Sequence, residues 1–148
     1  FRIIGWGEPI AGRIKKMISD YKLTNVNLTT VFLQSDELRN TMLSAHVMLG
    51  QFSGHPRLDR TIQNKNIEAL ALGLPLVTRD SPSNRELLEN GLNCLFVRPS
   101  DPRALADAIL RLKTDQMMLS KIASEAQVTY SQRLMAEILT EQVAFSVK

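Results

Sequence analysis

Residues 61–78 read Thr61-Ile62-Gln63-Asn64-Lys65-Asn66-Ile67-Glu68-Ala69-Leu70-Ala71-Leu72-Gly73-Leu74-Pro75-Leu76-Val77-Thr78, and this stretch decides the fold. The pattern predicts a polar loop, a helix over 64–72, a stop at Gly73 and a buried strand over 75–78. The amide groups at the start of a helix suit a phosphate. Glu68, one turn further on, can accept hydrogen bonds from both hydroxyls of a ribose, and charged acceptors make stronger bonds than neutral ones. The stretch therefore predicts that one short helix binds two parts of a nucleotide.

Strand and helix signals alternate along the rest of the chain. Alternation with short connections predicts a parallel sheet covered by helices on both faces, a three-layer α/β/α, Rossmann-like fold. Residues 50–62 have no apolar period and form the longest expected loop. The expected strands are 2–4, 26–33, 45–49, 75–78 and 93–97, and the expected helices are 8–21, one from Ser35, 64–72, 84–89, one capped by Asp101 with Pro102, 115–128 and 132–146.

Ligands of such sheets bind beyond the carboxyl ends of the strands. The segments that belong to this rim are Gly5-Trp6-Gly7, the loop 50–62 and the start of the helix 64–72, joined by Asp80-Ser81 after the next strand. Long loops in compact domains are often functional. We therefore expect the binding residues to lie in these segments.

Composition restricts the class of protein. The chain has 148 residues, most simply one domain over 1–148. Its net charge is +3, without a basic run, so nucleic acid is not an expected partner. A mildly basic face can instead meet phosphates or a membrane surface. No apolar run approaches the ~20 residues of a membrane span.

The few residues that could bind a metal or act as nucleophiles are dispersed. Cys94 lies in an apolar run and is interpreted as a buried structural thiol. His46 lies on an expected buried strand and is interpreted as a core or edge histidine, whereas His55 is either near a ligand or simply exposed. No spacing of His, Cys and carboxylates indicates a metal site.

Three stretches in the second half carry a family resemblance. Glu68–Thr78 resembles a Glu-Ala-x-Ala-x-Gly-x-Pro-Val-Val motif, Asn84–Leu95 resembles an Arg-Glu-Leu motif that ends in Gly and Leu, and Asp101–Ile109 resembles the helix that follows. Gly5-Trp6-Gly7-Glu8 and Ser44–Val47 match weaker upstream patterns in the right order. Together they resemble the C-terminal, nucleotide-sugar donor-binding domain of retaining glycosyltransferases with the GT-B fold, of the group 1 or family 4 type.

The resemblance assigns roles to individual residues. It implies that Glu68 holds the donor ribose. The family's first motif Glu would fall on Arg60, with Asp59 one place away, and which of the two replaces it stays open. Thr61–Lys65 resembles the stretch Thr-Ile-Pro-Asn-Lys, which is typical of a sub-group of the family that also lacks this first Glu. The implied site residues are Glu68 for ribose; Arg60, Thr61, Ile62, Asn64 and Lys65 for phosphate or sugar; Gly5 and Gly7 for close backbone approach; and Thr30, Val31, Phe32 and Leu33 for the nucleobase.

Simpler interpretations of the same residues stay open. Lys65 and Glu68 are spaced i, i+3 and can form a surface ion pair worth about 0.5 kcal/mol, or Lys65 can face a phosphate. Asn64 is expected to cap the helix. Arg60 either contacts a diphosphate or is a solvated loop residue.

The resemblance also implies an activity for a longer protein. That protein would transfer a sugar, with retention, from a nucleotide diphosphate to a glycan, lipid or small-molecule acceptor, for example in cell-envelope polysaccharide biosynthesis. It would need no cofactor or metal, and it would work in the cytoplasm or at the membrane surface. The chain begins at Phe1 inside a strand, so we expect an excised piece whose acceptor domain and diphosphate-binding Arg and Lys lie upstream. Such a piece alone should not catalyse.

Two other classes of protein remain as alternatives. One is a sugar-nucleotide epimerase or hydrolase of the same architecture, and the other is a non-catalytic α/β interaction domain. The fold by itself does not choose among them. The donor base, the sugar, the acceptor and the oligomeric state are not encoded in any motif that we recognise.

Overall fold

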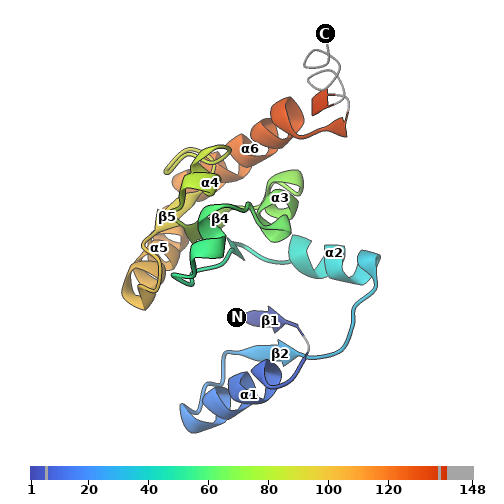
Figure 1. The fold of residues 1–148 in the computed structure, drawn as a ribbon, viewed down its shortest axis with the longest axis vertical. Coiled ribbons are helices and arrows are strands. Elements are labelled where there is room, and N and C mark those ends of the chain that lie inside the picture. The colour runs from blue at the N-terminus through green and yellow to red at the C-terminus, as the bar shows by residue number, and fades with distance from the viewer. Residues whose placement is uncertain (6, 137, 140–148) are drawn as a thin grey trace. The chain divides into compact units, whose positions relative to one another are not determined.

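The computed structural model describes residues 1–5, 7–136, 138 and 139 (Figure 1). The chain forms two compact units, Phe1–Thr41 and Met42–Lys148. Each unit is described by itself below. Both contain parallel strands with flanking helices, so the predicted α/β class is confirmed.

The first unit contains a two-stranded parallel sheet of β1 (Arg2–Ile4) and β2 (Asn27–Thr29). Helix α1 (Ile10–Asp20) connects them, and α2 (Ser35–Leu43) begins in this unit and runs across the boundary. The predicted strand over 26–33 is too long. The last ladder bond runs from the Gly5 amide to the Thr29 oxygen at 3.0 Å, and β1 offers no residue for the chain after Thr29 to pair with.

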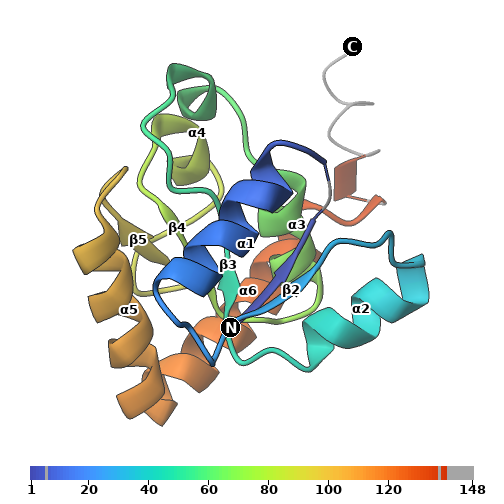
Figure 2. The ribbon, with the colours of Figure 1, turned by 90° about the horizontal axis from the view of Figure 1, so that it is seen from below.

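The second unit contains a three-stranded parallel sheet. Its strands are β3 (Met48–Leu49), β4 (Leu76–Arg79) and β5 (Leu95–Val97), with β4 in the middle (Figure 2). Every residue of β4 is buried, as expected of a parallel strand covered on both faces. Strands β3 and β5 are shorter than the strands predicted over 45–49 and 93–97. His46 is exposed and precedes β3, so its placement on a buried strand was wrong.

Helices cover both faces of this sheet. Successive side chains of a strand point to opposite faces, and Leu76 and Val77 accordingly belong to two different hydrophobic clusters. The first cluster joins β4 to α3 (Asn64–Ala71) and α6 (Gln116–Arg133) through Leu70 and Ala126. The second joins β4 and β5 to α5 (Pro102–Thr114) and α6 through Leu112 and Ile122.

Two of the predicted helix ends are confirmed by their caps. Helix α3 ends as expected before Gly73, which takes the left-handed conformation with φ 62°. Helix α5 begins with Asp101 accepting a hydrogen bond from the Ala104 amide at 2.9 Å. The prediction that Asn64 caps α3 was wrong. Asn64 is the first helical residue, and Gln63 occupies the cap position.

Other helix boundaries differ from the prediction. The helix predicted over 84–89 is α4 (Pro82–Arg85), which begins earlier because the Ser81 hydroxyl accepts from the Asn84 amide at 3.2 Å. The break predicted between helices over 115–128 and 132–146 is not present. Helix α6 continues through residues 128–132, because no Gly or Pro interrupts it there. Residues 137 and 140–146 of the second one lie outside the described residues.

The predicted loop over 50–62 is not irregular throughout. It contains the short 3₁₀ helix η1 (Pro56–Asp59), which His55 caps. Among the described residues, no helix is both long and apolar enough to cross a bilayer.

Candidate donor-binding site

The start of α3 presents free amide groups. The Gln63 oxygen accepts from the amides of Asn66 (2.9 Å) and Ile67 (3.4 Å). Within the described part of the chain, no hydrogen bond is made by the amides of Asn64 and Lys65. These two groups and the helix dipole favour an anion at this end of α3.

Lys65 and Glu68 follow on the first turns of α3. Lys65 is half-buried and Glu68 is exposed. Partial burial lowers the pKa of Lys65, and the nearby Glu68 carboxylate opposes this shift. In the described residues no ion pair within 4.0 Å joins the two side chains. The local ion pair is therefore not formed, and both charged groups can meet a ligand.

In the loop before α3, the acidic residue Asp59 forms an ion pair and the basic residue next to it, Arg60, does not. Asp59 forms an ion pair with Arg79, whose side chain is only 4% exposed. Arg60 is exposed, and its side chain has no ion-pair partner among the residues described. Of the two residues near the position of the family's first Glu, Arg60 is thus the one whose charge is not already used.

Thr61 is exposed, whereas Ile62 is half-buried. The Thr61 hydroxyl donates to the Arg57 oxygen at 3.2 Å, and the half-buried Ile62 packs against the first hydrophobic cluster. A ligand at the start of α3 would meet the backbone of Ile62 rather than its side chain.

A buried polar network holds α3 against the sheet, and the sequence analysis did not identify it. The side-chain nitrogen Nδ2 of Asn66 lies 3.2 Å from the Asn84 side-chain oxygen and 3.4 Å from the Thr78 hydroxyl. Asn84 in turn donates to the Arg79 oxygen at 2.9 Å. Asn66, Thr78 and Asn84 are fully buried. Buried polar groups are usually paired. Here the hydrogen bonds tie α3 to β4 and α4, while the side-chain oxygen of Asn66 is buried without a hydrogen-bond partner among the described residues.

The remaining candidates belong to the first unit. Gly7 has φ 108°, and a Cβ built at Gly5 or Gly7 meets no atom within 4 Å. Both positions therefore leave open space for close approach to their backbone. Of the expected nucleobase segment, Val31 and Phe32 are exposed, and Thr30 and Leu33 are half-buried. All of these residues follow the strand ends of the 1–41 unit.

The Cys94 thiol and the His55 side chain have local roles. Cys94 is fully buried in the first cluster, and burial raises the pKa of its thiol, which confirms the interpretation as a buried structural residue. The Nδ1 atom of His55 accepts from the Arg57 amide at 3.1 Å and so caps η1. Among the described residues, no three His, Cys, Asp or Glu side chains gather in a way that could hold a metal ion.

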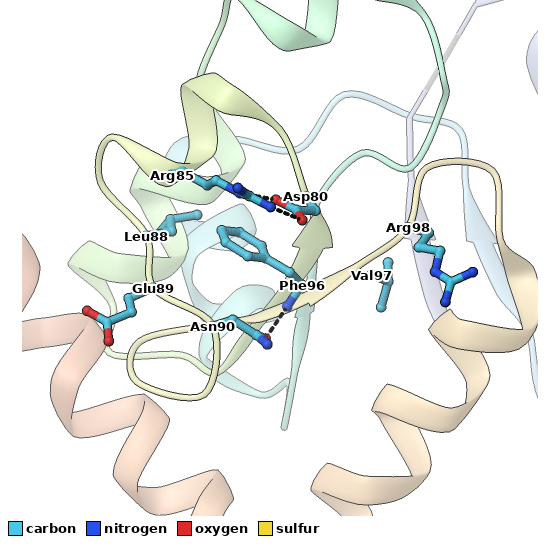
Figure 3. A pocket seen from close by; sticks show the side chains of 8 residues that line it. All are labelled: Asp80, Arg85, Leu88, Glu89, Asn90, Phe96, Val97 and Arg98. Carbon is cyan, nitrogen blue, oxygen red and sulfur yellow. Dashed lines mark hydrogen bonds and ion pairs between the residues drawn. The ribbon is translucent and has the colours of Figure 1, made fainter.

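A separate hollow of about 460 Å³ lies beside α4 and β5 (Figure 3). Arg85 donates to both carboxylate oxygens of Asp80, each at 2.6 Å, and these bonds lower the pKa of Asp80. Phe96 lines the same hollow (Figure 3). None of the candidate residues at the start of α3 lines the hollow.

Comparisons with known proteins point to one class of enzyme. A protein from Bacillus subtilis described as a glycosyltransferase, YtcC, is 30% identical over 99 residues, which are 66% of this chain and 23% of that protein. The amylovoran biosynthesis glycosyltransferase AmsK of Erwinia amylovora is 25% identical over 155 residues, covering 94% of this chain and 36% of AmsK. The chain thus spans about a quarter to a third of the length of these relatives.

A solved structure has the same fold. The crystal structure of HepE from Anabaena in complex with UDP-glucose matches with a TM-score of 0.81 at 22% identity, over 99% of this chain and 40% of HepE. The fold agrees with that of GT-B glycosyltransferases. Residues 1–115 match the sequence family of glycosyl transferases group 1, and the chain belongs to that family.

Proposed function

We propose that this chain binds the nucleotide-diphosphate-sugar donor of a retaining glycosyltransferase. Family membership supports the class of enzyme. The observation that carries the donor assignment is the start of α3, where two free amides, the half-buried Lys65 and the exposed Glu68 follow one another within about a turn. Amides and a cation suit the diphosphate, and a carboxylate suits the ribose diol.

The same groups suit the chemistry of the reaction. In a retaining transfer the sugar becomes oxocarbenium-like while negative charge grows on the leaving diphosphate. Groups that already point at this charge stabilise the transition state without further rearrangement. In the proposal, Lys65, Arg60 and the amides of α3 supply part of this stabilisation, and neither a metal nor a cofactor is needed.

A longer protein would carry out the complete reaction. We propose that an acceptor-binding domain forms the other wall of the cleft and that the 148-residue chain alone transfers no sugar. AmsK is named for amylovoran biosynthesis, which supports a glycan as the acceptor. Work in the cytoplasm or at the membrane surface is part of the same proposal.

Calorimetric titration of the chain with UDP, GDP and ADP tests the donor assignment. We expect weak binding of one of the three. Glu68→Ala should weaken it about tenfold, equivalent to about 1.4 kcal/mol, because the ribose loses a charged acceptor. Glu89→Ala, which removes an exposed carboxylate that lines the separate hollow and not the start of α3, should bind as the unchanged chain does.

Two results would count against the proposal. Equal affinities for the Glu68→Ala and unchanged chains would remove Glu68 from the site. If none of the three nucleotides binds, the chain behaves as a non-catalytic α/β interaction domain would.

A further inference from the structure

We infer that Arg79 is a positioning residue for the donor site, acting through the loop that leads into α3. The inference rests on the proposed function, because it concerns the same site. Arg79 ends β4 and is 4% exposed, so its guanidinium lies beneath the loop rather than in solvent. Its role is to hold the loop from below, not to touch the donor.

Within the described part of the chain, the hydrogen bonds of the Arg79 side chain all go to this loop. Its Nη1 donates to the backbone oxygens of Ser53 at 2.9 Å and His55 at 3.3 Å, and its Nη2 pairs with the Asp59 carboxylate. The planar fork of an arginine fits three such acceptors at fixed angles, which a lysine cannot do. One side chain therefore sets the path of the loop at three points.

Two serines, Ser83 and Ser100, also hold the loop, one near each of its ends. The buried Ser83 hydroxyl lies 3.2 Å from the Leu58 oxygen and 3.1 Å from the Thr61 oxygen. Since a hydroxyl has one proton, it donates to one of them at a time or is shared. Ser100, which follows β5, accepts from the Gly54 amide at 3.1 Å. The loop is thus anchored to residues that follow β4 and β5 as well as to Arg79.

The burial of Arg79 is incompletely compensated. Its Nε atom is buried without a hydrogen-bond partner. A buried, unpaired donor costs free energy that an apolar side chain at the same place would not. The arrangement therefore favours a fixed loop over the most stable core, which is what a binding loop requires.

The loop ends where the proposed site begins. Thr61, the last residue anchored by Ser83, is followed two residues later by Gln63, the cap of α3. Arg60 lies between the Asp59 contact and the Thr61 contact, so both of its neighbours are held. Fixing the loop in advance reduces the entropy lost when a ligand binds.

The decisive variants are Arg79→Met, which removes the fork but keeps a long apolar stem, and Arg79→Lys, which keeps the charge. Arg103→Met, at an exposed arginine of α5, is the matched control. Asp59→Ala removes the same ion pair from its half-exposed side and provides a second variant if Arg79→Met does not fold. Amide hydrogen exchange and titration with the nucleotide that binds best among UDP, GDP and ADP are measured on each chain.

We expect Arg79→Met to speed exchange across residues 53–61, to leave β4 and β5 protected, and to weaken nucleotide binding about tenfold. Arg79→Lys and Asp59→Ala should give smaller changes of the same kind, and Arg103→Met none. The tenfold penalty of Glu68→Ala should shrink when Arg79→Met is already present, because a donor that the loop positions less firmly also makes a weaker bond to the Glu68 carboxylate.

Three results would overturn the inference. They are unchanged exchange over 53–61, unchanged affinity of Arg79→Met, or penalties of Glu68→Ala and Arg79→Met that multiply independently. If the unchanged chain binds no nucleotide, the proposed function fails and the donor-site role of Arg79 fails with it, while the exchange data still decide whether Arg79 holds the loop.

Discussion

Gly50 shows how closely single residues are packed around the candidate site. It follows β3 and is buried beside the polar network of Asn66 and Thr78. A Cβ at Gly50 would lie 2.2 Å from the Thr78 hydroxyl oxygen and 2.9 Å from the Asn66 side-chain oxygen. Both neighbours are fully buried, so neither can swing out to solvent.

Gly50→Ala should therefore destabilise the chain by about 1–3 kcal/mol through overpacking. The free energy of unfolding in urea measures the effect. Gly54→Ala is the control, because its Cβ would come no closer than 3.4 Å to another atom, and its stability should be near that of the unchanged chain. A Gly50→Ala chain as stable as the Gly54→Ala chain would contradict the close packing.

The candidate site could be predicted from sequence only in part, and the difference between Lys65 and Arg79 shows why. Lys65 and Glu68 lie in one short helical motif, so their relation depends on spacing alone. Arg79 ends an apolar strand, and nothing local indicates that its partners are Ser53, His55 and Asp59, at least 20 residues earlier in the chain. A charged residue at the end of a buried strand was the one available signal.

Elements were predictable where a local signal marks their ends. Asp101-Pro102 gave the start of α5, because a capping carboxylate followed by proline suits the first turn of a helix. The same signal in Ser81-Pro82 was not used when the helix was predicted over 84–89, and α4 was placed too late. Strand lengths were overestimated, because a strand continues only as far as its neighbour, and apolar residues such as Val31 do not reveal where that neighbour ends.

The cap of α5 gives a prediction at this scale. Asp101→Ala removes the acceptor of the Ala104 amide and should cost about 1 kcal/mol of stability. Asp107→Ala removes an exposed carboxylate from the middle of the same helix and should cost clearly less. Thermal unfolding followed by circular dichroism compares the two. Equal transition temperatures for the two variants would mean that the cap contributes nothing.

At the scale of the whole molecule, the buried apolar residues are unevenly distributed. Both hydrophobic clusters are built from residues of the 42–148 unit, on the two faces of the β3-β4-β5 sheet. Of the described residues in the 1–41 unit, Ala11 is the one apolar residue classed as buried. The sequence pattern predicted a parallel sheet without dividing its strands between two groups, because alternation of strands and helices does not report which strands share a core.

A chain of residues 42–148 should therefore fold without residues 1–41. Burial of apolar surface is the main favourable term in folding, and both clusters are retained in the shorter chain. We expect a cooperative urea transition with a midpoint close to that of the 148-residue chain, whereas residues 1–41 alone should show no cooperative transition. Circular dichroism in urea measures both. If residues 42–148 unfold without a cooperative transition, the two clusters do not suffice to hold the β3-β4-β5 sheet, and the source of stability must include residues 1–41.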